Sequence, residues 1–220
     1  MPPTTIEENK MIGDLVRQEL PNYASRRLQK IAAAAGVLLV GQILGKVKIG
    51  ALTQAFVGTG NGTLTGLAAK NLTVPGDYVL TCVAASTDAA TFSVVTPSGE
   101  RLKDATLGVA YSSDHLAFQL NDGSVDFTVG AKFTITVAPG SGDFKPAVVG
   151  AVDGSQTPEA ILLQEVDASV NAVEDVLVLD REAQVVVSEL VYHASADNAD
   201  KKAAQRAFLE EKGIQFISAA

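Results

Sequence analysis

The side chains with the greatest capacity for chemistry in this sequence form one short polar run. Ser112, Ser113, Asp114 and His115 are consecutive and supply the residue types of a nucleophile, an acid and a base. A catalytic triad requires these groups to converge in space with the acid orienting the base, and adjacency in sequence does not provide that geometry. We therefore interpret the run as the composition of a loop and predict no hydrolytic chemistry.

The lone cysteine and the second histidine also have structural explanations. Cys82 lies among apolar residues in the segment 78–83, with no basic side chain or histidine close in sequence. A reactive thiolate needs electropositive neighbours, so the pattern predicts a buried, inert thiol. His193 follows Tyr192 just before a predicted helix, and we expect it to be a packing or interface residue.

Three further patterns match ligand-binding motifs only in part. The glycine-rich run 58–62 is not followed by a Lys-Ser/Thr pair or a predicted helix, so it reads as a linker and not as a phosphate loop. Residues 121–126 lack the spacing and the closing Glu of a calcium loop, and a β-turn accounts for them. The carboxylate pairs 174–175 and 210–211 are adjacent, which points their side chains apart. We predict no catalytic residue, metal ligand or cofactor.

Composition favours a structural or binding protein. The chain has 220 residues, of which 47% are hydrophobic and 19% charged, so a packed core is expected. Its net charge of −8 excludes general nucleic-acid binding, which depends on basic side chains neutralising phosphates. One Cys and two His leave little for a zinc cluster or a disulfide framework.

The N-terminal region is the only part with a basic surplus. Formal charge is +3 over residues 1–55, −3 over 56–145 and −8 over 146–220. Within residues 1–30, Ile12, Leu15, Val16 and Leu20 recur at helical spacing before Pro21, which leaves a short helix and a loose arm as alternatives.

The apolar run after Arg26-Arg27 resembles an export signal or a membrane segment only in part. Gln29 stands where a twin-arginine signal requires Phe, and the run 31–44 contains glycines and falls short of the roughly 20 apolar residues of a spanning helix. Two buried strands, at 36–41 and 42–47, explain the same residues without a membrane.

Residues 56–145 predict a separate small β-sandwich. Phe133, Ile135 and Val137 alternate with polar residues as in a half-buried strand, and eight of the twelve Phe and Tyr residues lie in this segment. Turn sequences separate the expected strands, and the glycine-rich run 139–143 reads as a flexible joint. Strands are expected at 77–83, 90–96, 117–120 and 132–137.

The last third predicts strands followed by one helix. Strand candidates are 159–166, 175–179 and 184–190. A helix from about Ala199 to Lys212, capped by Ser195 or Asp197 and ended by Gly213, precedes a short terminal strand at 214–217.

The two ends of the chain resemble the head decoration proteins of lambda-type tailed phages. The resemblance lies in the order of Asp153-Gly154-Ser155, Glu159 to Leu162, Val166 to Ser169, Val176 to Arg181, and the Asp197 to Phe208 helix with Gly213-Ile214. Tyr23 to Arg26 and the stretch 36–45 are also similar to the N-terminal part of that family. Coverage is about 20–50 and 147–220, with the middle module inserted where short family members have a turn.

The resemblance implies a mainly β fold with one C-terminal helix, in which a small decoration core is interrupted by a β-sandwich-like domain. The expected domains are a capsid-binding arm at 1–30, a discontinuous core at 31–55 and 146–220, and an inserted all-β domain at 56–145. Candidate arm residues for capsid contact are Leu15, Val16, Leu20, Tyr23, Arg26 and Arg27.

The resemblance also implies a late structural protein that assembles in the host cytoplasm and is no enzyme. It would trimerise on the outer surface of the expanded head and cement the major capsid protein, with no nucleic-acid or membrane partner. The alternative is a virion surface or fibre-associated module whose middle β domain recognises a receptor or carbohydrate.

Overall fold

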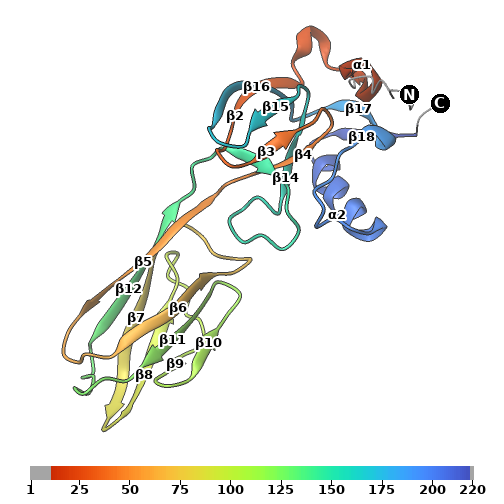
Figure 1. The fold of residues 1–220 in the computed structure, drawn as a ribbon. Coiled ribbons are helices and arrows are strands. Elements are labelled where there is room, and N and C mark those ends of the chain that lie inside the picture. Colours follow the sequence, from red (N-terminus) through yellow and green to blue (C-terminus); the bar gives the residue numbers. More distant parts are fainter. Residues whose placement is uncertain (1–10, 219–220) are drawn as a thin grey trace, which may run out of the picture. The chain divides into compact units, whose positions relative to one another are not determined.

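The computed structural model describes residues 11–218, which divide into two compact units (Figure 1). Unit 1 takes in the chain up to Lys46, the segment Gly142–Ala151 and the chain from Ser155 onward; unit 2 consists of Val47–Ser141 and Val152–Gly154. Strands make up 48% of the described residues and helices 11%, which confirms the predicted mainly β class. No helix in the described part is long and apolar enough to span a membrane.

Unit 1 is built around a closed five-stranded barrel. Its strands follow the order β13-β2-β16-β14-β4. The second half of strand β16, from Val176 to Leu179, is continuously apolar because its residues face two cores: Val176 and Val178 pack in one core cluster, whereas Leu177 and Leu179 pack in a second one. Both faces of the strand are therefore covered by other parts of unit 1. The bounds are β2 (Arg26–Ile31), β4 (Ile43–Lys46), β13 (Phe144–Pro146), β14 (Pro158–Leu162) and β16 (Val173–Leu179).

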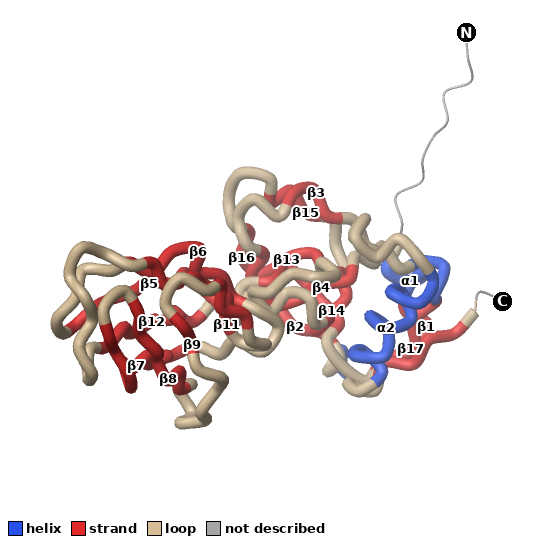
Figure 2. Tube along the Cα trace, turned by 90° about the horizontal axis from the view of Figure 1, so that it is seen from below, coloured by secondary structure: helices blue, strands red, loops and turns tan. Residues whose placement is uncertain are grey.

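The second core cluster of unit 1 lies between the barrel and the elements that cover it. Leu15, Ile161 and Leu209 are fully buried there, and they come from the N-terminal, central and C-terminal parts of the unit. Both helices belong to this unit, and Figure 2 shows them in blue beside β1 and β17. The remaining elements are α1 (Ile12–Leu15), the three-stranded sheet of β1 (Val16–Glu19), β17 (Ala183–Val186) and β18 (Ile214–Ile217), the ribbon of β3 (Gly36–Leu38) and β15 (Val166–Ala168), α2 (Ala199–Glu210), and the 3-10 turns η1 (Pro21–Tyr23) and η2 (Val187–Glu189).

The predicted helical patch at residues 12–20 is only partly helical. A single turn, α1, ends at Leu15, and the chain continues as β1, in which Val16 pairs with Val185 of β17. Local apolar spacing favoured a longer helix, but backbone pairing with a strand far along the chain and the β-branched Val16 override it.

The C-terminal helix was predicted with the wrong cap. Asn198 is the N-cap, and its Oδ1 accepts a hydrogen bond from the Lys201 amide at 2.9 Å. Asp197 instead forms an ion pair with Lys201 Nζ at 3.0 Å, and Ser195 bonds to His193. Gly213 follows the helix with φ +80°, and the expected terminal strand is confirmed as β18.

Unit 2 is a β-sandwich. A five-stranded sheet, in the order β5-β12-β7-β8-β9, shares one core cluster with a three-stranded sheet in the order β10-β11-β6. Four of its phenylalanines, at 56, 92, 127 and 133, pack with ring centroids 4.6 to 5.8 Å apart. The bounds are β5 (Ile49–Val57), β6 (Thr63–Ala69), β7 (Gly76–Ser86), β8 (Ala89–Val95), β9 (Ala105–Thr106), β10 (Ala110–Ser112), β11 (Leu116–Asn121) and β12 (Lys132–Pro139).

The edges of unit 2 differ from the sequence-based expectation. Its first strand, β5, begins at Ile49 and pairs Phe56 with Phe133 of β12, so the sandwich starts before residue 56. The run 58–62 is no free linker, because a Cβ on Gly60 would lie 2.4 Å from the ring of Phe127. The predicted joint at 139–143 is also paired: the Gly140 amide donates to the Lys48 carbonyl at 2.8 Å.

Candidate functional site

The six residues predicted for capsid contact do not share one environment. Leu15 is fully buried in the second core cluster of unit 1, and Val16 packs against the same cluster. Leu20 is half-buried. These three side chains stabilise unit 1, so the helical spacing that drew attention to them reflects core packing. Residues 11–30 are thus part of a folded unit, and the rest of the predicted arm, residues 1–10, lies outside the described residues.

Tyr23, Arg26 and Arg27 lie at the surface around the η1 turn. Asn22 and Tyr23 both have positive φ, 59° and 58°, and this turn leaves Tyr23 65% exposed. The guanidinium carbon of Arg26 lies 4.6 Å from the centre of the Tyr23 ring. Arg27 is paired with Asp180 at 3.2 Å and remains half exposed.

Arg26 is held in place by Glu19. Its Nε donates to Glu19 Oε2 at 2.8 Å, and a second nitrogen donates to Oε1 at 2.5 Å. This two-point contact raises the pKa of Arg26, because the carboxylate stabilises the charged guanidinium. The stack of Arg26 on Tyr23 is therefore fixed by a third residue.

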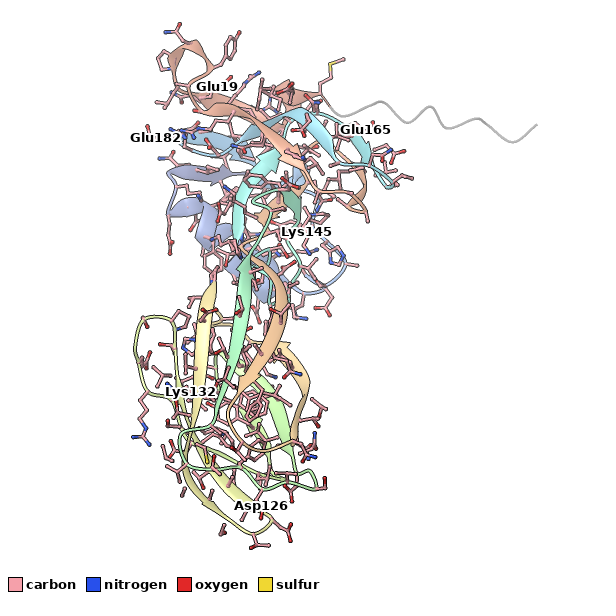
Figure 3. All side chains as sticks on the ribbon, turned by 90° about the vertical axis from the view of Figure 1, so that its left-hand side faces the viewer. Glu19, Asp126, Lys132, Lys145, Glu165 and Glu182 are labelled. Carbon is pink, nitrogen blue, oxygen red and sulfur yellow. The ribbon has the colours of Figure 1, made fainter. Side chains whose placement is uncertain are left out.

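A buried serine anchors this turn to the rest of unit 1. Ser25 Oγ accepts a hydrogen bond from the Leu20 amide at 3.0 Å and donates to the Glu182 carbonyl at 2.7 Å. Beside it lies a hollow of about 590 Å³ lined by Gln18, Glu19, Leu20, Pro21, Glu182, Ala183, Gln184, Gly213 and Gln215. Figure 3 labels two of these lining residues, Glu19 and Glu182. We call Tyr23, Arg26, Arg27 and this hollow the N-terminal surface.

Three exposed aliphatic side chains belong to or flank the β3–β15 ribbon of unit 1. Val37 is 58% exposed, Leu39 50% and Val170 80%. Exposed apolar side chains that are grouped in one element often mark a protein contact. We call these three the ribbon residues. Sequence reasoning missed them, because the run 36–41 predicts a buried strand that includes Val37 and Leu39, and Val170 lies outside the predicted strands.

The side chains of the Ser112–His115 run do not assemble a triad. Ser113 Oγ accepts from the amides of His115 and Leu116 and so closes a turn. His115 Nδ1 contacts the hydroxyl of buried Tyr78 at 3.1 Å. Within residues 11–218 no hydrogen bond joins Asp114 to His115, so the acid does not orient the base.

The thiol of Cys82 is 1% exposed, as predicted, and burial raises its pKa. His193 Nδ1 lies 2.9 Å from Ser195 Oγ, which also accepts a hydrogen bond from the Val149 amide. Both groups have a packing role.

Three exposed carboxylates gather near the predicted turn at 121–126. Asp122 and Asp126 are joined by Asp88 from the β7–β8 turn, with ligand atoms within 4.8 Å of one another. Asp126, which Figure 3 labels, accepts a hydrogen bond from the Asp88 amide at 3.0 Å. Asp88 lies far away in sequence, so no spacing motif could have found this group.

A comparison with protein families matches residues 5–214 to the model described as Bacteriophage lambda head decoration protein D. The match spans most of the chain and includes segments of both units. Searches of curated proteins and of solved structures find no match.

Proposed function

The chain belongs to the lambda head decoration protein D family, and from that premise we propose that it acts as a homotrimer bridging major capsid subunits. As a family member it is a capsid decoration protein: a structural, non-enzymatic component that sits on the virion capsid. The family match is the observation that carries this function. The trimer, the bridging role and the residues that contact the shell are the proposed part.

The N-terminal surface is the proposed capsid contact. Tyr and Arg are among the residue types enriched at the energetic centres of protein interfaces, and Arg26, which is paired with Glu19, lies over the ring of Tyr23. Strand β1 lies at the edge of its sheet among the described strands, next to this surface. An edge strand offers backbone groups to which a capsid strand can add.

The ribbon residues are the proposed trimer contact. A trimer multiplies weak contacts with the shell into one tight attachment, since the second and third copies bind at high effective concentration. Burial of Val37, Leu39 and Val170 between copies would remove exposed aliphatic surface from water.

Binding to capsids tests the function. Purified protein is expected to bind expanded empty heads and to ignore unexpanded ones, measured by co-sedimentation. The double variant Tyr23→Ala/Arg27→Ala should lose about tenfold or more of its affinity, since each is an exposed candidate anchor. The matched control in unit 2 is Val109→Ala/Arg101→Ala, at positions that are also exposed. Equal loss in both variants would contradict the assignment of the contact.

The folded elements of unit 1 limit how many N-terminal residues can be deleted. Removal of residues 1–30 would take away α1, β1 and nearly all of β2, a central barrel strand, and so would unfold the unit. Removal of residues 1–10 leaves all described elements in place. Full capsid affinity after that shorter deletion would exclude residues 1–10 from attachment and leave the N-terminal surface as the contact.

Light scattering tests the trimer. The expected molar mass is three times that of one chain. Val37→Asp should shift the protein toward monomer, because a buried charge disfavours the contact, whereas Val109→Asp, which is equally exposed on unit 2, should not. A parent protein that is monomeric both in solution and when attached to capsids would refute the trimer.

A further inference from the structure

The Ser112–His115 run, which the capsid function does not use, lines a polar cleft within unit 2. The cleft measures about 520 Å³ and is lined by Leu72, Glu100, Leu102, Lys103, Ser112, Ser113, Asp114 and His115. The four polar residues of this run do not converge as a triad, but all four line the cleft. Its size is in the range of sites that hold small ligands.

The histidine in this cleft is held in one orientation. The Tyr78 hydroxyl accepts a hydrogen bond from the Val74 amide at 3.0 Å and lies 3.1 Å from His115 Nδ1. Nδ1 is thereby occupied, and Nε2 is the ring nitrogen left to contact a ligand in the cleft. Thr73 Oγ1 donates to the His115 carbonyl, which clamps the 70–74 loop onto the 112–116 turn.

Charged groups with no ion-pair partner in the described chain surround the histidine. The carboxylates of Glu100 and Asp114 are exposed, and Lys103 Nζ lies 5.3 Å from the centre of the buried Tyr111 ring. Glu100 and Asp114 supply two carboxylates and Lys103 one ammonium group, and a neighbouring hollow adds Lys70, so the site has little net charge and does not favour phosphate, sulfate or other anions. The polar lining also disfavours an apolar ligand, because its hydrogen-bonding groups would lose water without replacement.

We propose that unit 2 binds neutral saccharides in this cleft. Asp114 and Glu100 accept hydrogen bonds from sugar hydroxyls, while Lys103 donates to them and His115 Nε2 forms a hydrogen bond with them. Leu72, which is 56% exposed, and Leu102 provide aliphatic surface for the C–H face of a sugar ring.

A second hollow extends the cleft beyond a single ring. It measures about 360 Å³, shares Ser112, Ser113 and Asp114 with the first, and adds Lys70, Asn71 and Val152. All of these residues belong to unit 2. The Asn71 amide supplies both a donor and an acceptor, so the surface suits an oligosaccharide whose neighbouring rings contact the two sides of Asp114.

The test uses the full-length protein on a glycan array, followed by saturation-transfer NMR with glucose, galactose, mannose and N-acetylglucosamine. Binding of at least one neutral sugar is expected. Asp114→Asn removes one charged acceptor with little change of shape and should weaken binding about tenfold or more; His115→Ala should do the same. Asp122→Asn is the matched control, because it removes an equally exposed carboxylate of unit 2 outside the cleft.

Each other outcome overturns the proposal. Absence of binding to any neutral sugar refutes the ligand class, and binding restricted to sulfated or phosphorylated glycans shows that Lys70 and Lys103 attract anions instead. Equal binding by Asp114→Asn, His115→Ala and Asp122→Asn refutes the site. Binding only to proteins on host surfaces also refutes it. Circular dichroism confirms that the variants fold, and capsid co-sedimentation, which depends on unit 1, keeps this result separate from the decoration function.

Discussion

Unit 2 encloses a single core in which four phenylalanine rings meet between two sheets, whereas unit 1 divides its core into two mainly aliphatic clusters on either side of barrel strands. Unit 2 comes almost entirely from one continuous segment, whereas unit 1 combines three. The ends of the main unit 2 segment lie side by side: Ile49 pairs with Pro139, and Gly140 bonds to Lys48. A module whose ends meet can be inserted into a loop without opening the host unit.

This contrast predicts that core changes in one unit leave the other intact. The largest effect is expected for Phe92→Ala, because Phe92 is fully buried and contacts two other rings of the cluster. Its removal should lower the stability of unit 2 by about 4 kcal/mol. Calorimetry should show one unfolding transition displaced to lower temperature. The control Phe208→Ala, at a partly exposed position of unit 1, should change little; a single transition that moves as a whole would show that the units unfold together.

Unit 1 also depends on a close approach between two backbone segments. A Cβ on Gly45 of β4 would lie 2.1 Å from the carbonyl oxygen of Ser155, a contact that backbone atoms cannot relieve cheaply. Gly45→Ala should destabilise unit 1 by about 3 kcal/mol and leave the unit 2 transition unchanged. Gly13→Ala, where a Cβ meets nothing within 4 Å, is the matched control. Equal effects of the two substitutions in thermal unfolding would contradict this account.

A substitution of Ser25, with a smaller expected loss of stability, tests whether the N-terminal segment is folded or is a loose arm. Ser25→Ala leaves the part-buried Leu20 amide and the Glu182 carbonyl without their shared partner. The expected loss is about 2 kcal/mol of unit 1 stability in denaturant unfolding. Ser188→Ala, which removes an exposed hydroxyl, should be nearly neutral. A neutral result for Ser25→Ala as well would mean that residues 20–25 contribute no stability to unit 1.

The smallest effect concerns the start of α2 and depends on pH. The hydrogen bond and ion pair with Lys201 lower the pKa of the Asp197 carboxyl. A carboxyl whose pKa is lower in the folded than in the unfolded protein stabilises the fold at pH values above its unfolded pKa of about 3.9. This stabilisation is lost as pH falls through the folded pKa. Asp197→Asn should therefore be slightly less stable than the parent at neutral pH and equal to it in strong acid. A difference that persists in acid would exclude the ion pair as its cause.

Local patterns were sufficient for elements whose signals lie within a few residues. The alternation of Phe133, Ile135 and Val137 predicted β12, and the polar and apolar faces of residues 199–210 followed by Gly213 predicted α2. The aromatic content of the middle segment likewise indicated a separate core. These signals suffice because side-chain direction repeats every two residues in a strand and every 3.6 residues in a helix.

The candidate sites depended on contacts between distant residues. Leu15 and Val16 were assigned to an arm, because nothing near them in sequence shows that β17, more than 160 residues later, pairs with this segment. The contact of His115 with Tyr78 has the same origin, and so does the approach of Asp88 to Asp122 and Asp126.

The amino-acid sequence by itself determined the mainly β class, the C-terminal helix, the acidic net charge, the scarcity of catalytic side chains, and the resemblance to phage decoration proteins. Only the tertiary structure decided which residues of the N-terminal segment are buried and where the inserted sandwich begins. It also decided that Ser112 to His115 line a cleft and do not form a triad. The reason is that backbone periodicity and turn chemistry are local, whereas burial and the meeting of polar groups depend on which strands pair, and that pairing joins segments from opposite ends of the chain.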